Sequence, residues 1–131
     1  MIVDTSALIA ILRGEPEGEA FTQAIVAAFP AKMSAGTLLE AALVVDGLGD
    51  AVKSRRFDEL VRTLGIDIVA TSAQHVEIAR AAYRDFGKGS GHPARLDFGD
   101  CFAYALASQT GEPLLFKGDD FIHTDLHPAL P

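Results

Sequence analysis

The sequence predicts an α/β fold, with a parallel β-sheet flanked by α-helices in a single compact domain. Short apolar runs alternate with stretches of helical periodicity, which is the pattern of strands separated by helices. Hydrophobic residues make up 49% of the 131 residues and the mean hydropathy is +0.22, so the chain can bury a core of its own. No linker, low-complexity tract or repeat divides it, and we therefore expect one domain over residues 1–131.

The first part of the chain predicts a strand, two helices and a second strand. The run MIVD is apolar up to Asp4, as in a short buried strand. Apolar residues then recur at helical spacing until Gly14, a residue type that commonly ends helices. A second helix is expected up to Phe29, with Pro16 near its first position, where proline is tolerated. Residues 31–36, AKMSAG, predict a short strand and turn.

The middle of the chain predicts two helices, a strand and another helix. Residues 37–49, TLLEAALVVDGLG, are almost continuously apolar and predict a mostly buried helix stopped by glycines. Residues 50–64 predict an amphipathic helix, and IDIVAT at 66–71 alternates as a strand does. Thr71 and Gln74 have the spacing of a capping box that starts the next helix.

The last part predicts a loop, a buried helix and a final strand. GKGSGHPARL, with three glycines and a proline, is the most loop-like stretch. LDFGDCFAYALA, at 96–107, starts an apolar helix that ends near Gly111. Asp97 is suited to be its N-cap, and Asp100 would favour the helix dipole from the third helical position. PLLF predicts the last core strand, and KGDDF at 117–121 a turn.

The composition restricts the classes of protein. A single Cys excludes an internal disulfide framework and fits a reducing compartment, so we expect a cytoplasmic protein. The apolar start is too short for a signal peptide, and no apolar run reaches the roughly 18 residues of a membrane span, so no membrane partner is expected. The net charge of −7 argues against a passive nucleic-acid binder, because such proteins are normally basic.

One set of acidic residues stands out because each member abuts apolar sequence. The set consists of Asp4 after the first strand, Glu40 within LLEAALVV, Asp97 and Asp100 at the start of the buried helix, and Asp119 and Asp120 after the last strand. In an open α/β sheet, ligands bind at the carboxyl ends of the strands, so these acids are expected to converge. Two carboxylates about 4 Å apart repel by roughly 4 kcal/mol at an effective dielectric of 20, and several of them need a proton or a cation. Oxygen ligands favour Mg²⁺ or Mn²⁺, which can activate water for phosphoryl chemistry.

Each of these acids also has a purely structural interpretation. Asp4 can cap the helix that follows it, and Thr37 with Glu40 has capping-box spacing. Asp97 and Asp100 are explained by helix-start chemistry alone, and GDD is common in turns. The metal-site hypothesis therefore depends on acids occurring together at four places, namely after the first strand, within the third helix, at the start of the buried helix and after the last strand.

Two other functions are compatible with parts of the sequence. A phosphoacceptor receiver-like domain would share the size, the acids and Lys117 after a late strand. Against it, Asp4 lacks a neighbouring acid and no Asp ends a clear central strand near residue 50. A non-catalytic acidic binding module would not need acids at four separated strand and helix ends.

Four segments of the sequence resemble the PIN-domain family, and more closely the VapC toxins of bacterial toxin–antitoxin pairs. They are, in the order of the family, MIVDTSALIAIL, SAGTLLEAALVV, LDFGDCFAYALASQTGEPLLFKGDDF and the closing TDL. The resemblance implies a PIN-like parallel sheet flanked by helices and Mg²⁺- or Mn²⁺-dependent endoribonuclease activity. By position, Asp4, Glu40 and Asp100 match the first three acids of the family's catalytic, metal-binding quartet. Asp119 is the first choice for the fourth acid and Asp120 the alternative.

The same resemblance implies roles for residues beside the quartet and for partners. Thr5 and Ser6 match the small hydroxyl residues that orient water or phosphate in the family. Asp97 stands where many relatives carry Asn, and it is either an auxiliary metal ligand or only a cap. Relatives of this kind are usually homodimers, and a VapB-type antitoxin covers the site with its C-terminal segment.

RNA has to approach a chain of net charge −7, so local basic side chains are the candidates for phosphate contact. They are Arg80 and Arg84 on one helix face, Lys88, His92 and Arg95 in the glycine-rich loop, and, as secondary candidates, Arg13 and Lys117. A solvated helix face and a mobile loop explain the same residues without any ligand.

Overall fold

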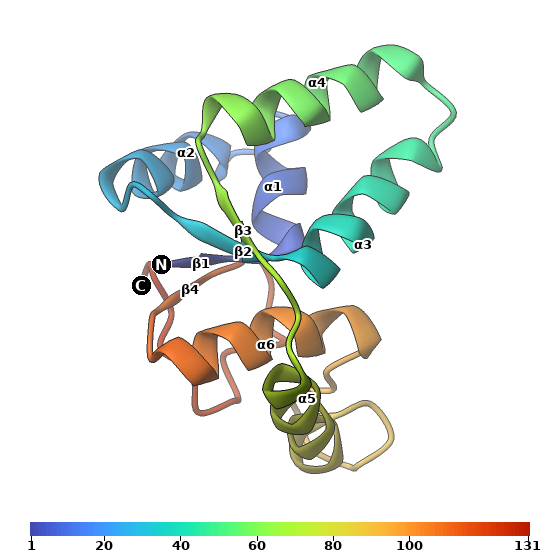
Figure 1. Ribbon diagram of the computed structural model, residues 1–131, viewed down its shortest axis with the longest axis vertical. Coiled ribbons are helices and arrows are strands. Elements are labelled where there is room, and N and C mark those ends of the chain that lie inside the picture. The colour runs from blue at the N-terminus through green and yellow to red at the C-terminus, as the bar shows by residue number, and fades with distance from the viewer.

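The computed structural model describes residues 1–131 and contains one parallel four-stranded sheet with six helices (Figure 1). The strands, in the order that they take across the sheet, are β3 (Asp67–Val69), β2 (Lys32–Ser34), β1 (Ile2–Val3) and β4 (Leu114–Leu115). The helices are α1 (Thr5–Leu12), α2 (Gly18–Ala27), α3 (Ala35–Asp46), α4 (Ala51–Thr63), α5 (Ala73–Phe86) and α6 (Phe98–Thr110). The predicted α/β class, a parallel sheet between helices in one compact domain, is confirmed.

The helices cover both faces of the sheet. In Figure 1, α1 to α4 lie on one side of the strands, and α5 and α6 lie on the other. The chain steps outward from β1 to β2 to β3 and then returns across the sheet to place β4 beside β1. The strand order therefore reverses between β1 and β4, which is where open α/β sheets bind their ligands.

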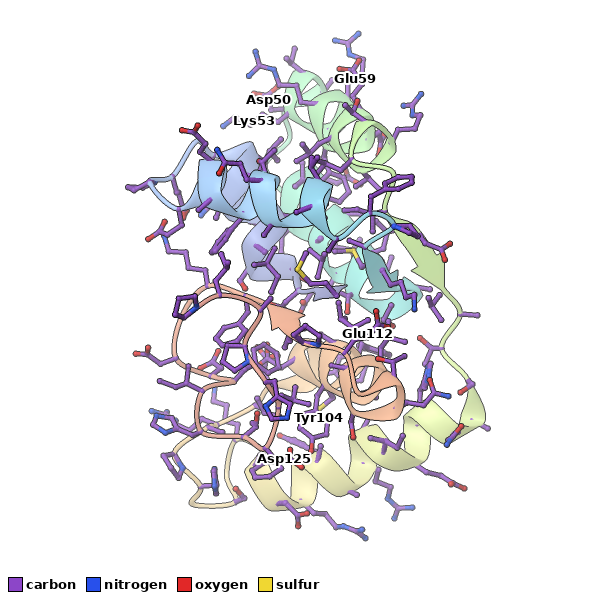
Figure 2. The ribbon with its side chains drawn as sticks, turned by 90° about the vertical axis from the view of Figure 1, so that its left-hand side faces the viewer. Asp50, Lys53, Glu59, Tyr104, Glu112 and Asp125 are labelled. Atoms are coloured by element: carbon purple, nitrogen blue, oxygen red, sulfur yellow. The ribbon has the colours of Figure 1, made fainter.

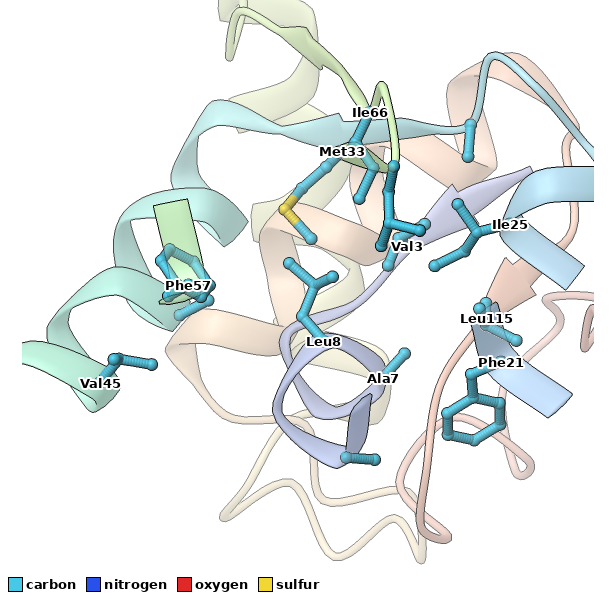
Figure 3. Close-up of a cluster of buried hydrophobic side chains, with 14 residues drawn as sticks. Val3, Ala7, Leu8, Phe21, Ile25, Met33, Val45, Phe57, Ile66 and Leu115 are labelled. Atoms are coloured by element: carbon cyan, nitrogen blue, oxygen red, sulfur yellow. The ribbon is translucent and has the colours of Figure 1, made fainter. Parts of the chain in front are cut away.

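Successive residues of the strands point to opposite faces and fill two cores. Val3 and Leu115 belong to the core beneath α1 to α4 (Figure 3), whereas Ile2 and Leu114 belong to the core beneath α5 and α6. None of the four is more than 1% exposed. Burial of one such side chain stabilises the fold by roughly 1.5–3 kcal/mol, so burial holds strands of only two residues in place.

The start of α3 differs from the prediction because the helix follows β2 without a turn. Ser34, the last residue of β2, is its N-cap, and the Ser34 hydroxyl oxygen accepts a hydrogen bond from the Gly36 N–H at 3.3 Å. Thr37 and Glu40 therefore lie inside α3, and the alternative of a Thr37–Glu40 capping box is wrong. Glu40 is thus left without a capping role.

Two other helix starts are also displaced. The capping box of α5 is formed by Ser72 and His75, one residue later than the predicted Thr71–Gln74 pair. Pro16 precedes the start of α2 at Gly18 by two residues, since a turn separates them. The predicted start of α6 is confirmed, with Asp97 as its N-cap.

Helix α3 is less buried than its apolar sequence predicted. Only Thr37, Ala41 and Val45 of this helix are buried. Leu39 and Leu43, one turn apart, are 60% and 61% exposed, because no other element covers that face. A continuously apolar sequence is compatible both with a helix that is buried on all sides and with one that is buried on a single face. The sequence of α3 alone therefore did not predict its exposed face.

Polar contacts fasten both ends of the chain to the sheet and to α6. Glu112 accepts hydrogen bonds from the amino terminus at 2.7 Å and from Lys32 at 2.9 Å. The Tyr104 hydroxyl of α6 donates to Asp125 at 2.6 Å, and both residues are labelled in Figure 2. No helix in the structure has the length and apolar character needed to cross a membrane.

Candidate active site

A cleft opens at the carboxyl ends of β1 and β4, where the strand order reverses. Its volume is about 500 Å³. Its walls come from α1, from α3, from the start of α6 and from the segment after β4, and the lining residues are Asp4, Thr5, Ser6, Ile9, Arg13, Glu15, Glu40, Val44, Asp97, Asp100, Lys117 and Gly118. The fold therefore brings together Asp4, Glu40 and Asp100, as the sequence predicted.

Asp4 uses its two carboxylate oxygens differently. Oδ2 accepts hydrogen bonds from the Ser6 N–H at 3.0 Å and from the Ser6 hydroxyl at 2.7 Å, so Asp4 is the N-cap of α1. Oδ1 is buried and has no hydrogen-bond partner. Burial raises the pKa of Asp4 to about 6; the Ser6 hydrogen bonds lower the pKa, and the Glu40 charge raises it. The cap and a ligand role are thus compatible, because they involve different oxygens.

Glu40 reaches the cleft from α3 and is held by α1. The Thr5 hydroxyl, at the first position of α1, lies 2.6 Å from Glu40 Oε1 and donates a hydrogen bond to it. The Glu40 charge contributes to the raised pKa of Asp4, so the two carboxyls interact electrostatically. Thr5 therefore ties together the elements that carry the first two acids of the predicted quartet.

Asp100 enters the cleft from the first turn of α6. Asp97 is the predicted N-cap, and with Asp100 it forms a full capping box: Asp100 Oδ2 accepts from the Asp97 N–H at 3.0 Å, and Asp97 Oδ1 accepts from the Asp100 N–H at 2.9 Å. Burial raises the pKa of Asp100 to about 8; the hydrogen bond from Asp97 lowers the pKa, and the charges of Asp4, Asp97 and Asp120 raise it. Asp97 thus caps α6 and also adds negative charge to the cleft.

The two acids after β4 differ in their relation to Asp100. Both are exposed and neither lines the cleft. The charge of Asp120 raises the pKa of Asp100, whereas Asp119 acts on its neighbour Asp120. Burial also raises the pKa of Asp120, with Asp97 and Asp119 adding to it and Arg95 lowering it. Of the two, only Asp120 is among the charges that raise the pKa of Asp100, and the choice of the fourth acid stays a prediction.

The acids fit a hard divalent cation in chemistry, although no ready-made metal site is formed. No three His, Cys, Asp or Glu side chains lie close enough together to hold a metal ion. The available donors are all oxygens, and they include the unpartnered Asp4 Oδ1. A buried carboxylate oxygen without a partner is costly, and a bound cation would compensate it.

The hydroxyls of Thr5 and Ser6 hold acids in place. The Thr5 proton is donated to Glu40, and the Ser6 proton to Asp4. Ser6 Oγ also accepts from the Lys117 N–H at 2.9 Å, which links α1 to the segment after β4. In this arrangement both hydroxyl protons are donated to carboxylates, and a role of either hydroxyl in orienting water or phosphate stays a prediction.

The basic candidates divide into those at the cleft and those away from it. Arg80, Arg84, Lys88 and Arg95 are exposed and do not line the cleft. Arg80 instead borders an apolar hollow of about 480 Å³ between α5 and α6. Arg95 is the member of this group whose charge reaches Asp120.

The secondary basic candidates, Arg13 and Lys117, both line the cleft. Lys117 is paired, because its ammonium group contacts Glu15 and lies 3.2 Å from Glu17. The sequence indicated only a helix start for these two glutamates. Glu15 and Glu17 are about a hundred residues away from Lys117 in the sequence. Their opposite charge was the only feature of the sequence that could have indicated this ion pair.

Comparisons with known proteins identify the family of the chain. The chain matches the family description "PIN domain" over residues 1–126. It is 49% identical to the protein named ribonuclease VapC28 of Mycobacterium tuberculosis, with 99% of this chain and 98% of the relative covered. It is 46% identical to ribonuclease VapC30 of the same organism, with both chains fully covered.

Solved structures show the same fold. Mycobacterium tuberculosis VapC20, described as a sarcin–ricin loop cleaving toxin, superposes with a TM-score of 0.72 over 95% of each chain at 14% identity. A toxin–antitoxin complex from Klebsiella pneumoniae gives a TM-score of 0.67 at 20% identity, covering 92% of this chain and 88% of that one. With the family match and the relatives of nearly equal length, this chain belongs to the PIN-domain family and, within it, to the VapC ribonucleases.

Proposed function

We propose that this chain is a Mg²⁺- or Mn²⁺-dependent endoribonuclease, the toxin of a toxin–antitoxin pair, and that it hydrolyses RNA phosphodiester bonds at the acidic cleft. The observation that carries the proposal is Asp4, which lines a cleft together with Glu40 and Asp100 and whose buried Oδ1 has no partner. The relatives named ribonucleases, at 49% and 46% identity over nearly the whole chain, support the same activity.

In this proposal Asp4 and Asp100 hold the principal ion, and Glu40 completes the ring of oxygens. The fourth acid comes from the turn after β4, where the electrostatic contact with Asp100 favours Asp120 over Asp119. A bound divalent ion would supply Lewis acidity, which would polarise a phosphodiester oxygen and make a bound water more acidic. The protein holds the carboxylates of Glu40 and Asp4 in place through hydrogen bonds from Thr5 and Ser6. It also leaves Asp4 Oδ1 without a hydrogen-bond donor, so that this oxygen can bind the ion.

The raised pKa values of Asp4 and Asp100 matter for this role. In the metal-free chain, protons and a cation compete for the same carboxylates, because a ligating carboxylate must be ionised. The mutual repulsion that favours protonation is also what a divalent charge relieves. The centre is therefore expected to release protons when it binds the ion.

RNA is the proposed substrate, and Arg13 is the basic residue best placed for a phosphate at the cleft. It lines the cleft, its side chain is 56% exposed, and its only ion pair is a long one of 4.0 Å to Glu15. Lys117 lines it too, but its charge is balanced by Glu15 and Glu17. Arg80, Arg84, Lys88 and Arg95 remain candidates for a longer RNA that extends beyond the cleft.

The proposal includes a cognate VapB-type antitoxin that blocks the cleft, a homodimer, and action in the cytoplasm. The structural similarity to a chain from a toxin–antitoxin complex is consistent with such a partner. The receiver-like alternative loses support, because the strand order β3–β2–β1–β4 differs from the 2-1-3-4-5 order of that fold.

The direct test is cleavage of RNA by the purified chain, followed by sequencing of the new RNA ends. Cleavage is expected with Mg²⁺ or Mn²⁺ and none in EDTA. A matched control is Asp58→Asn on α4, which replaces an exposed acid away from the cleft and is expected to leave cleavage unchanged. Full activity in EDTA would contradict the metal-dependent mechanism.

A further inference from the structure

Gly99, the second residue of α6, lies directly against the Glu40 carboxyl of α3. A Cβ atom added at Gly99 would lie 1.3 Å from Glu40 Oε2 and 2.2 Å from Glu40 Cδ. The carboxyl group thus occupies the space that any side chain at this position would need. Gly99 is helical and has no positive φ, so its backbone conformation does not require glycine. Glycine is also unfavourable within helices, which leaves the space for Glu40 as the physical reason for it here.

A second glycine makes the contact between α3 and α6 reciprocal. A Cβ atom added at Gly36, in the first turn of α3, would lie 2.3 Å from Cδ1 of Phe102 in α6. Gly36 and Glu40 are one turn apart on α3, and Gly99 and Phe102 are one turn apart on α6. Each helix therefore contributes one glycine and one large side chain, and Figure 1 shows the start of α3 over the N-terminal end of α6.

The consequence concerns the acidic cleft. Glu40 is held on one side by the Thr5 hydroxyl, which bonds Oε1, and on the other by the bare backbone of Gly99, which adjoins Oε2. The residue after Gly99 is Asp100, so the same turn of α6 supplies an acid and the space for a second acid.

We propose that Gly99 is a positioning residue of the metal centre. Because Gly99 has no side chain, the Glu40 carboxylate can occupy the space next to its backbone and lie beside Asp4 and Asp100. This inference rests on the proposed function, because it assigns Glu40 a place among the metal ligands. A side chain at this position would turn Glu40 away from Thr5 and out of the ring of oxygens.

The test combines a crystal structure of metal-free Gly99→Ala with Mn²⁺ titrations followed by electron paramagnetic resonance. The crystal structure is expected to show Glu40 detached from Thr5. Mn²⁺ affinity is expected to fall by about tenfold or more, as it does when groups that orient metal ligands are lost. Gly47→Ala, at the exposed C-cap of α3, is the control for a helix-end glycine and should leave the affinity unchanged.

A double-mutant cycle separates positioning from general damage to the fold. Glu40→Asp shortens the acid by one methylene, so its carboxyl no longer reaches the space beside Gly99. In that background, Gly99→Ala is expected to change Mn²⁺ affinity by only about twofold, the limit for sites that do not interact. If Gly99→Ala alone does not fold, recovery of cooperative thermal unfolding in the double variant supports the contact, and no recovery overturns it.

Two results would overturn different parts of the inference. A wild-type chain that binds Mn²⁺, together with a Gly99→Ala structure in which Glu40 keeps its bond to Thr5, would overturn the positioning role alone. Equal losses of affinity in the two backgrounds would do the same. A wild-type chain that binds no Mn²⁺ would overturn the proposed metal centre itself, and the positioning role with it.

Discussion

The Ser6 hydroxyl donates to Asp4 Oδ2 at 2.7 Å, while Oδ1 of the same carboxyl is buried without a partner. Oδ2 therefore caps helix α1, and Oδ1 remains available to a ligand.

Asp4→Asn is expected to abolish cleavage and to stabilise the metal-free fold. The amide oxygen can still accept from Ser6, but the ligand charge is lost, and we expect activity to fall by more than about a hundredfold. The pKa of Asp4 is raised from 3.8 to about 6, so at neutral pH its ionised form costs up to about 3 kcal/mol. The free energy of unfolding in urea and the rate of RNA cleavage measure the two effects. A variant that is less stable than wild type and still active would contradict both assignments.

The stability of the metal-free chain is expected to decrease as the pH rises through the pKa values of Asp4 and Asp100. A carboxyl whose pKa is raised by folding binds its proton more tightly in the native state. Its contribution to stability is complete below the unfolded pKa and is lost as the pH rises through the folded pKa, here about 6 and about 8. We expect a loss on the order of 5 kcal/mol between about pH 5 and pH 8, of which Asp100 contributes the larger part. Thermal unfolding in EDTA at pH values across this range measures the loss. Asp100→Asn should remove the part of the loss that occurs at the higher pH values, near the pKa of Asp100.

The two acids after β4 are expected to differ in their effect on cleavage. Asp120→Asn should reduce cleavage by about tenfold or more, because Asp120 interacts electrostatically with Asp100. Asp119→Asn, one residue away in the same exposed turn, is the matched control and should have the smaller effect. Cleavage rates at saturating Mn²⁺ decide between them. The reverse order of effects would restore Asp119 as the fourth acid.

Arg13→Ala is expected to weaken RNA binding more than Arg80→Ala/Arg84→Ala does. Arg13 lines the cleft, whereas the other two lie on α5 outside it. Loss of one phosphate contact lowers the slope of log affinity against log salt by about 0.7 for single-stranded RNA. Fluorescence anisotropy in the Asp4→Asn background, where RNA stays intact, measures both affinity and slope. An unchanged slope in Arg13→Ala would exclude a phosphate contact by this residue.

Much of the local structure could be predicted from the sequence, because it depends on neighbouring residues. Asp97 is the expected N-cap and Asp100 lies in the first turn as expected, since the geometry of a helix start is specified within four residues. The apolar runs near both ends of the chain became the neighbouring buried strands β1 and β4. The family resemblance, borne by segments that span nearly the whole chain, allowed Asp4, Glu40 and Asp100 to be named together.

Other features were decided by the tertiary structure, because they join residues far apart in the sequence. Which face of α3 is exposed depends on the elements that pack against it, and the apolar sequence of Leu39 and Leu43 did not reveal it. That the Asp120 charge raises the pKa of Asp100 depends on the direction of the chain after β4.

The sequence alone determined the fold class, the acids and their chemistry, because periodicity, capping and residue type are local properties. The tertiary structure decided how those acids are held. The Thr5–Glu40 bond, the unpartnered Asp4 Oδ1 and the fit of Glu40 against Gly99 all arise where β1, α3 and α6 meet. The physical reason is that the order of the strands brings these segments together, and no spacing along the chain encodes which atoms then touch.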